Sequence, residues 1–141
     1  MRVVLDANVL VSALISRAGA PARLLALWLE GEFELVVCET LLEEVEKTLG
    51  RPKIGARVSQ ADADAFVRLL RELAESVAEP KEPPAIRSAD PNDDYLIAMA
   101  ARERVPLVSG DQHLLELGDR FPIMSPRAFL DHLDKVRTGR A

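Results

Sequence analysis

Apolar residues follow two different periods along this chain, and the period predicts which segments form strands and which form helices. Short apolar runs predict strands of a buried parallel sheet, and they lie at residues 2–5, 34–37, 106–108 and 123–124. Between them, apolar residues recur every three or four positions, as in amphipathic helices. The predicted helices cover residues 8–18, 21–31, 40–49, 59–75, 90–104 and 112–117 and a segment after 126. This alternation predicts an α/β fold, a three-layer α/β/α sandwich around a central parallel sheet.

The chain length predicts a single domain. A chain of 141 residues with 48% hydrophobic residues is long enough and apolar enough to bury one core without disulfides. Pro80, Pro83 and Pro84 mark residues 79–89 as an extended connector within it. We expect the domain to cover residues 1–134 and a short basic tail to follow at 135–141.

Charge and cysteine content exclude several classes of function. The 18 Lys and Arg residues against 23 Asp and Glu residues give a net charge of −5, which argues against bulk adhesion to nucleic acid or an anionic membrane. A local basic patch is still compatible with this charge, and Arg17, Arg51, Lys53 and Arg57 fall in or near predicted loops. The single Cys38 excludes an internal disulfide framework. With no signal-peptide pattern and no long apolar run, we expect a cytoplasmic protein without a membrane partner.

Two acidic residues directly follow predicted strands. Asp6 ends the run at residues 2–5, and Asp111 comes shortly after the run at 106–108. A lone Asp in such a place is usually a turn former or a helix cap. Since ligands of parallel sheets bind beyond the carboxyl ends of the strands, two acids at one rim instead suggest a site where a cation offsets their repulsion.

A third acid comes from the helix after Pro91. At 100° per residue, Asp93 shares a face with Leu96, Ile97 and Ala100. A carboxylate at the head of a core-facing stripe needs a partner, and a metal ion is one. Asp93 is therefore the better candidate for the third acid of the site, and Asp94 is the alternative.

The helix at residues 40–49 offers three glutamates. Glu43 fits a capping box with Thr40, whereas Glu44 and Glu46 flank the apolar stripe on opposite sides. Pattern alone does not choose between these two.

In order along the chain, these acids resemble the motifs of PIN domains. The opening MRVVLDANVLV, the segment EVEKTL followed by RPK, the run DDYLIAMA and the segment LVSGD look like the family's four motifs. The resemblance extends from residue 1 to about 133, and it selects Glu44 as the second acid. It is strongest for small prokaryotic proteins similar to VapC toxins. One departure is His113, where many relatives carry another Asp.

The resemblance implies a ribonuclease that depends on Mg²⁺ or Mn²⁺, and the oxygen-rich site suits such a cation. By resemblance, Asp6, Glu44, Asp93 and Asp111 would be both the catalytic residues and the metal ligands. Around them, Asn8, Ser109 and Asp94 would support these ligands. The expected partners are an RNA substrate, a separate antitoxin protein and a second copy in a homodimer.

Two alternatives belong to other classes of function. One is a non-catalytic PIN-like module that binds RNA or a protein, which metal binding would distinguish from the nuclease. The other is a phosphohydrolase with Asp6 as its nucleophile. Such enzymes typically carry a second Asp two residues later, where this chain has Asn8.

Overall fold

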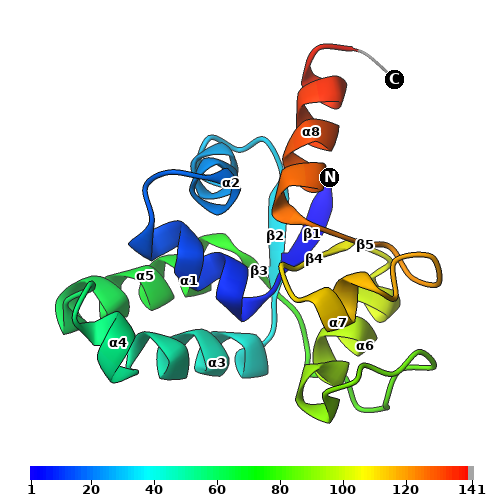
Figure 1. The fold of residues 1–141 in the computed structure, drawn as a ribbon, viewed down its shortest axis with the longest axis horizontal. Helices are drawn as coiled ribbons and strands as arrows, with labels where there is room; N and C mark the ends of the chain where they lie inside the picture. The colour runs from blue at the N-terminus through cyan, green and yellow to red at the C-terminus, as the bar shows by residue number, and fades with distance from the viewer. Residues whose placement is uncertain (140–141) are drawn as a thin grey trace.

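In the computed structural model, which describes residues 1–139, five strands form one parallel sheet (Figure 1). The order across the sheet is β3-β2-β1-β4-β5, and every neighbouring pair is parallel. The strands are β1 (Arg2–Leu5), β2 (Glu34–Val37), β3 (Glu75–Ser76), β4 (Leu107–Val108) and β5 (Ile123–Met124). The first strand is thus central, and its carboxyl end lies beside that of β4.

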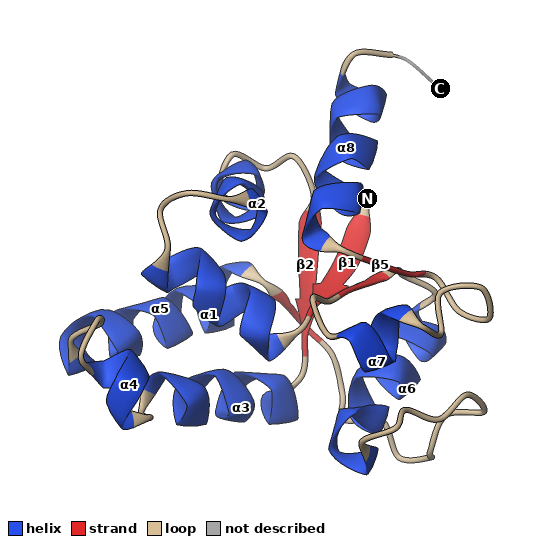
Figure 2. Ribbon diagram, in the orientation of Figure 1, coloured by secondary structure: helices blue, strands red, loops and turns tan. Residues whose placement is uncertain are grey.

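Helices cover both faces of the sheet, which confirms the predicted three-layer α/β/α architecture (Figure 2). Because crossovers between parallel strands are right-handed, the helices between β1 and β3 lie on one face, and those between β3 and β5 lie on the other. The first group is α1 (Ala7–Ile15), α2 (Ala20–Leu29), α3 (Glu39–Leu49), α4 (Pro52–Gly55) and α5 (Gln60–Leu73). The second is the 3-10 turn η1 (Pro91–Asp93), α6 (Asp94–Glu103) and α7 (Gln112–Leu115), and α8 (Pro126–Arg137) returns to pack on α2.

The core is one continuous aliphatic cluster centred on the sheet. The apolar residues of β1, β2 and β4 are almost fully buried, as expected for strands covered on both faces. Helices α1, α3 and α6 contribute the residues that pack against them, among them Leu10, Leu41 and Met99. This packing fixes the carboxyl ends of β1 and β4, where the predicted acids lie.

Two elements differ from the sequence-based prediction in the segment between β2 and β4. The helix expected to reach residue 75 ends at Leu73, and Glu75–Ser76 forms the short edge strand β3 instead. Strand β3 has no apolar alternation that could reveal it, since both residues are exposed. The short helix α4 was also not expected, because Pro52 is equally typical of a loop.

The caps of α1 and α3 come from acidic side chains. Asp6 caps α1, the usual role of an Asp in such a place, and its carboxylate accepts the backbone N–H of Val9 at 2.8 Å. Helix α3 begins at Glu39 without a Thr40–Glu43 capping box. Its first turn is capped from a distance, because Glu79 of the connector accepts both the backbone N–H and the hydroxyl of Thr40.

The C-terminal boundary also needs a correction. Helix α8 continues to Arg137, so residues 135–137 of the expected tail are helical. Lys135 and Arg137 lie in its last turn, where positive charge stabilises a helix. Residues 140–141 of that tail lie outside the described residues. Within residues 1–139 no single helix is long and apolar enough to cross a membrane; only α1 and α2 taken together, with a 91° bend between them, meet that test.

Candidate active site

The register between β1 and β4 places Asp6 beside Ser109. Leu5 pairs with Val108, and the backbone N–H of Asp6 donates to the Val108 carbonyl at 3.0 Å. The Ser109 hydroxyl donates to the Asp6 carboxylate, and its oxygen accepts the backbone N–H of Asp111 at 3.0 Å. One fully buried hydroxyl thus joins the two acids predicted at the strand ends.

Asp6 is the most buried acid of the chain, with 4% of its surface exposed. Burial raises the pKa of Asp6, and the carboxylates of Asp111 and Glu44 raise it further, whereas hydrogen bonds from Ser109 and Val9 lower it. The net rise means that the ionised carboxylate is poorly compensated in the protein alone. A bound cation would supply the missing compensation.

Glu44, on α3, lies close enough to Asp6 for its charge to raise the pKa of Asp6. The hydroxyl of Tyr95, on α6, donates to the Glu44 carboxylate. Burial, and then the hydrogen bond to Glu44, raise the pKa of Tyr95, so the phenol stays a donor. Glu43 and Glu46 on the same helix are exposed to solvent. Among the three glutamates of α3, the structure therefore brings Glu44 to the other acids.

Asp93 ends the 3-10 turn before α6 and also faces these acids. Its pKa is raised to about 6, mainly by burial and to a smaller extent by the negative charges of Asp90, Asp111, Glu44 and Asp6. Its neighbour Asp94 is engaged elsewhere: it forms an ion pair with Arg87 at 2.9 Å and accepts the backbone N–H of Ser88 at 2.8 Å. Asp94 thus fastens the proline-rich connector to α6.

The four acids fit a hard divalent cation by their chemistry but do not form a finished metal site. Carboxylate oxygens are the donors that Mg²⁺ and Mn²⁺ prefer. Burial is the largest cause of the raised pKa values of Asp6 and Asp93, and the neighbouring carboxylates raise them further. Within residues 1–139, however, no three His, Cys, Asp or Glu side chains are arranged to hold an ion. Ligation would require these side chains to move closer together.

A cavity of about 330 Å³ lies beside Asp111, the one of the four acids that lines it. Gly110 and, from α1, Asn8 and Ser12 also contribute to its lining. Asn8 is exposed on the first turn of α1. Of the residues expected to support the ligands, Ser109 contacts Asp6 directly, Asn8 lines the cavity, and Asp94 binds Arg87.

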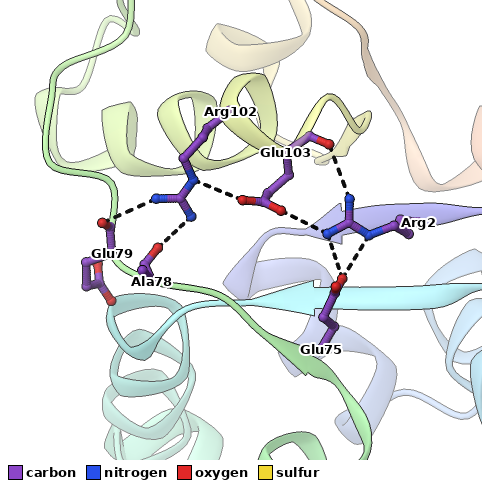
Figure 3. A network of polar contacts seen from close by, with 6 residues as sticks. All are labelled: Arg2, Glu75, Ala78, Glu79, Arg102 and Glu103. Atoms are coloured by element: carbon purple, nitrogen blue, oxygen red, sulfur yellow. Dashed lines mark hydrogen bonds and ion pairs between the residues drawn. The ribbon is translucent and has the colours of Figure 1, made fainter.

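A set of contacts that no sequence pattern reveals holds α3 and α6 together at the site. The backbone carbonyls of Ala78 and Glu79 accept hydrogen bonds from Arg102 of α6 (Figure 3). The Glu79 side chain in turn caps α3 through Thr40. Arg102 also contacts Glu103, which with Glu75 binds Arg2 at the start of β1. The connector thereby fixes α3, which carries Glu44, relative to α6, which carries Tyr95. No local sequence pattern signals a cap supplied from 39 residues away.

We predict that Ser109→Ala destabilises the protein by about 1–3 kcal/mol, because it leaves a buried carboxylate oxygen of Asp6 and the Asp111 N–H without a partner. Urea unfolding in EDTA measures the loss. Ser76→Ala, on exposed β3, is the control and should change stability by less than about 0.5 kcal/mol. Equal stability of the two variants would contradict the bridging role of Ser109.

We predict that the metal-free protein loses stability as the pH rises from about 4 to 7. The pKa of Asp93 is about 6 in the folded chain and about 3.9 in an unfolded one, so the folded state holds this proton more tightly. The resulting stabilisation is complete below the unfolded pKa and is lost as the pH rises through 6. Thermal melts in EDTA at several pH values test this, and Asp93→Asn should weaken the trend. An unchanged pH dependence in the variant would exclude Asp93 as its source.

The chain is similar to one protein family in sequence and to several solved structures in fold. Residues 2–113 match the PIN domain family, and no curated protein sequence matches the chain. Several solved structures are similar. PAE2754 from Pyrobaculum aerophilum has a TM-score of 0.64 and 18% identity, and the match covers 95% of this chain and 90% of that one. VapBC2 from Rickettsia felis, bound to a DNA fragment from its promoter, has a TM-score of 0.58 and 16% identity, and the match covers 88% of this chain and 97% of that one. FitAcB from Neisseria gonorrhoeae has a TM-score of 0.57 and 14% identity, and the match covers the same shares of the two chains.

At these identities the structural likenesses establish a shared fold. The family match is the stronger finding, since it extends over most of the chain and includes Asp6, Glu44, Asp93 and Asp111. It ends at His113, before β5 and α8, which complete the sheet and its covering layer. With the strand order, the acids at the carboxyl ends and this match in agreement, the chain belongs to the PIN domain family.

Proposed function

We propose that this protein is a metal-dependent endoribonuclease that cleaves RNA phosphodiester bonds. The observation that carries the proposal is the concentration of Asp6, Glu44, Asp93 and Asp111 at the carboxyl ends of β1 and β4, with raised pKa values at Asp6 and Asp93. Carboxylates that are gathered and partly buried in this way are unfavourable in their ionised form without a cation. The arrangement also suits chemistry on a phosphate, whose own charge the cation would help neutralise.

The four carboxylates would hold Mg²⁺ or Mn²⁺, and when bound the ion lowers the pKa of a water ligand and stabilises charge on the attacked phosphate. The chain's own residues prepare that arrangement. Ser109 fixes one carboxylate oxygen of Asp6, and Tyr95 fixes Glu44. Asn8, which lines the cavity beside Asp111, would donate a hydrogen bond to a phosphate oxygen.

We also propose that the protein is the toxin of a toxin–antitoxin pair, acts in the cytoplasm, forms a homodimer and is inhibited by a separate antitoxin. Support comes from the similar folds of the VapBC2 and FitAcB complexes. Copurification with the product of an adjacent small gene, followed by loss of nuclease activity in the complex, would test the partnership.

The nuclease proposal is tested by cleavage of a pool of structured and single-stranded RNA with Mn²⁺, Mg²⁺ or EDTA. The wild type and Asp93→Asn are compared in each condition. We expect cleavage that requires a divalent ion and is lost in the variant. Cleavage that persists in EDTA, or equally in the variant, would contradict the proposal.

A second candidate is a non-catalytic module that binds RNA or a protein. The absence of a formed metal site within residues 1–139 favours it. Calorimetric titration with Mn²⁺ separates the two candidates: heat of binding that is lost in Asp93→Asn supports the nuclease, and no binding supports the module.

A further inference from the structure

One stretch of this acidic chain carries cationic residues and no acidic residue. Residues 47–61 contain Lys47, Arg51, Lys53 and Arg57 and no Asp or Glu, whereas the remaining residues have fourteen cationic against 23 acidic side chains. All four cationic residues are exposed. Within residues 1–139, neither Arg51 nor Lys53 forms an ion pair. Positive charge is therefore available to a ligand around α4.

This basic stretch borders an apolar groove. A cavity of about 650 Å³ lies between α1, the end of α3 and α4, with Arg51 and Lys53 on its rim. Val11, Ile15 and Ile54 supply its aliphatic floor. A surface that combines an apolar floor with cations at the edge suits a ligand that is itself part apolar and part anionic.

The groove leads to the acidic site. Asn8 and Ser12, one turn apart on α1, line both this cavity and the one that contains Asp111. On α3, Thr48 lines the groove one turn beyond Glu44. Helices α1 and α3 run side by side from the sheet towards α4 (Figure 1). From Asn8 to Ile15 the groove follows about 10 Å of helix α1.

We propose that this groove binds single-stranded RNA beside the cleavage site, with a nucleobase on the aliphatic floor and neighbouring phosphates against Arg51 and Lys53. The inference rests on the proposed nuclease function and adds a path for the strand. A single strand is favoured because its unpaired bases can leave the stack and enter an apolar cavity, whereas bases within a duplex are inaccessible. RNA is favoured over a protein because the stretch that adjoins the groove carries four cations and no acid, which complements a polyanion.

The test measures binding separately from cleavage. Fluorescence anisotropy in EDTA and in Ca²⁺ follows a fluorescein-labelled 12-mer of single-stranded RNA at several salt concentrations. Arg51→Ala/Lys53→Ala should weaken binding about 10-fold at low salt and reduce the salt slope by about 1.4, or 0.7 for each phosphate that the variant no longer neutralises. The matched control Lys81→Ala/Lys135→Ala removes two exposed charges elsewhere and should bind like the wild type.

The apolar floor is tested by filling the groove. Ser12→Leu keeps a good helix former on α1 and occupies the space between the two cavities. The wild type should bind the 12-mer more tightly than an abasic strand of equal charge, and the variant should lose this preference. Equal melting temperatures show that the variant is folded.

The outcomes separate this inference from the nuclease proposal. Binding that depends on the groove, without cleavage in any divalent ion, would support the inference and contradict the nuclease. Cleavage with unchanged binding in both groove variants would overturn the inference alone. A change of oligomeric state in Arg51→Ala/Lys53→Ala without loss of RNA binding would assign the groove to a protein interface and overturn it as well.

Discussion

Replacing Asp93 with Asn should reduce the rate of RNA cleavage by about 10³-fold or more while leaving the protein folded. Asn has nearly the same shape as Asp but carries no charge, so the variant keeps its packing and loses a ligand for the cation that stabilises the phosphate in the transition state. In EDTA at pH 7.5 the variant should melt about 3 °C higher than the wild type. The reason is that the pKa of Asp93, about 6, reflects an ionised form that the metal-free fold disfavours.

The matched control is the adjacent Asp94→Asn, which should have the opposite profile. Asp94 is bound by Arg87 and by the Ser88 N–H. Its loss should lower the free energy of unfolding by about 1 kcal/mol and reduce cleavage less than 10-fold at a temperature where both variants are folded. Loss of cleavage in Asp94→Asn with activity retained in Asp93→Asn would assign the third carboxylate to Asp94.

The second large effect concerns the segment beyond the family match. Phe129 of α8 is fully buried and packs edge-on against Phe33, with 5.3 Å between ring centroids. Phe129→Ala should lower the free energy of unfolding by about 3–5 kcal/mol, because the variant buries less apolar surface and leaves a cavity. Because domains of this kind are stable by only about 5–15 kcal/mol, this loss is large enough to reduce the folded fraction at physiological temperature.

Urea unfolding measures this loss, and Val136→Ala on the same helix is the control. Val136 is 57% exposed, so its truncation should change stability by less than about 0.5 kcal/mol. If Phe129→Ala were as stable as this control, α8 would be an appendage, and the proposed single domain over residues 1–134 would be wrong.

The central strands of the sheet could be predicted from the sequence, because a strand that is covered on both faces consists of consecutive apolar residues. Residues 2–5 and 34–37 form strands with the predicted bounds. Strand β3 could not be predicted in this way, because its two residues are exposed and pair with β2 at the edge of the sheet. Helix α4 is a single turn after Pro52, too short for a periodic pattern to reveal it.

For the site, the sequence predicted which acids to consider but not how they are held. Helical geometry favoured Asp93 over Asp94, which stays a prediction. In the structure Arg87 engages Asp94, whereas the carboxylates of Asp111, Glu44 and Asp6 all raise the pKa of Asp93. The same geometry could not separate Glu44 from Glu46. That choice depends on Tyr95, which is 51 residues away and reaches Glu44 only in the folded chain.

Whether the four carboxylates form a divalent cation site is decided by a crystal of the wild-type protein soaked in Mn²⁺. Anomalous scattering then locates the ion without any assumption about activity. We expect a peak bounded by Asp6, Glu44, Asp93 and Asp111, with oxygen ligands from at least two of them. A peak elsewhere in the molecule, or none at saturating Mn²⁺, would contradict the proposed cation site.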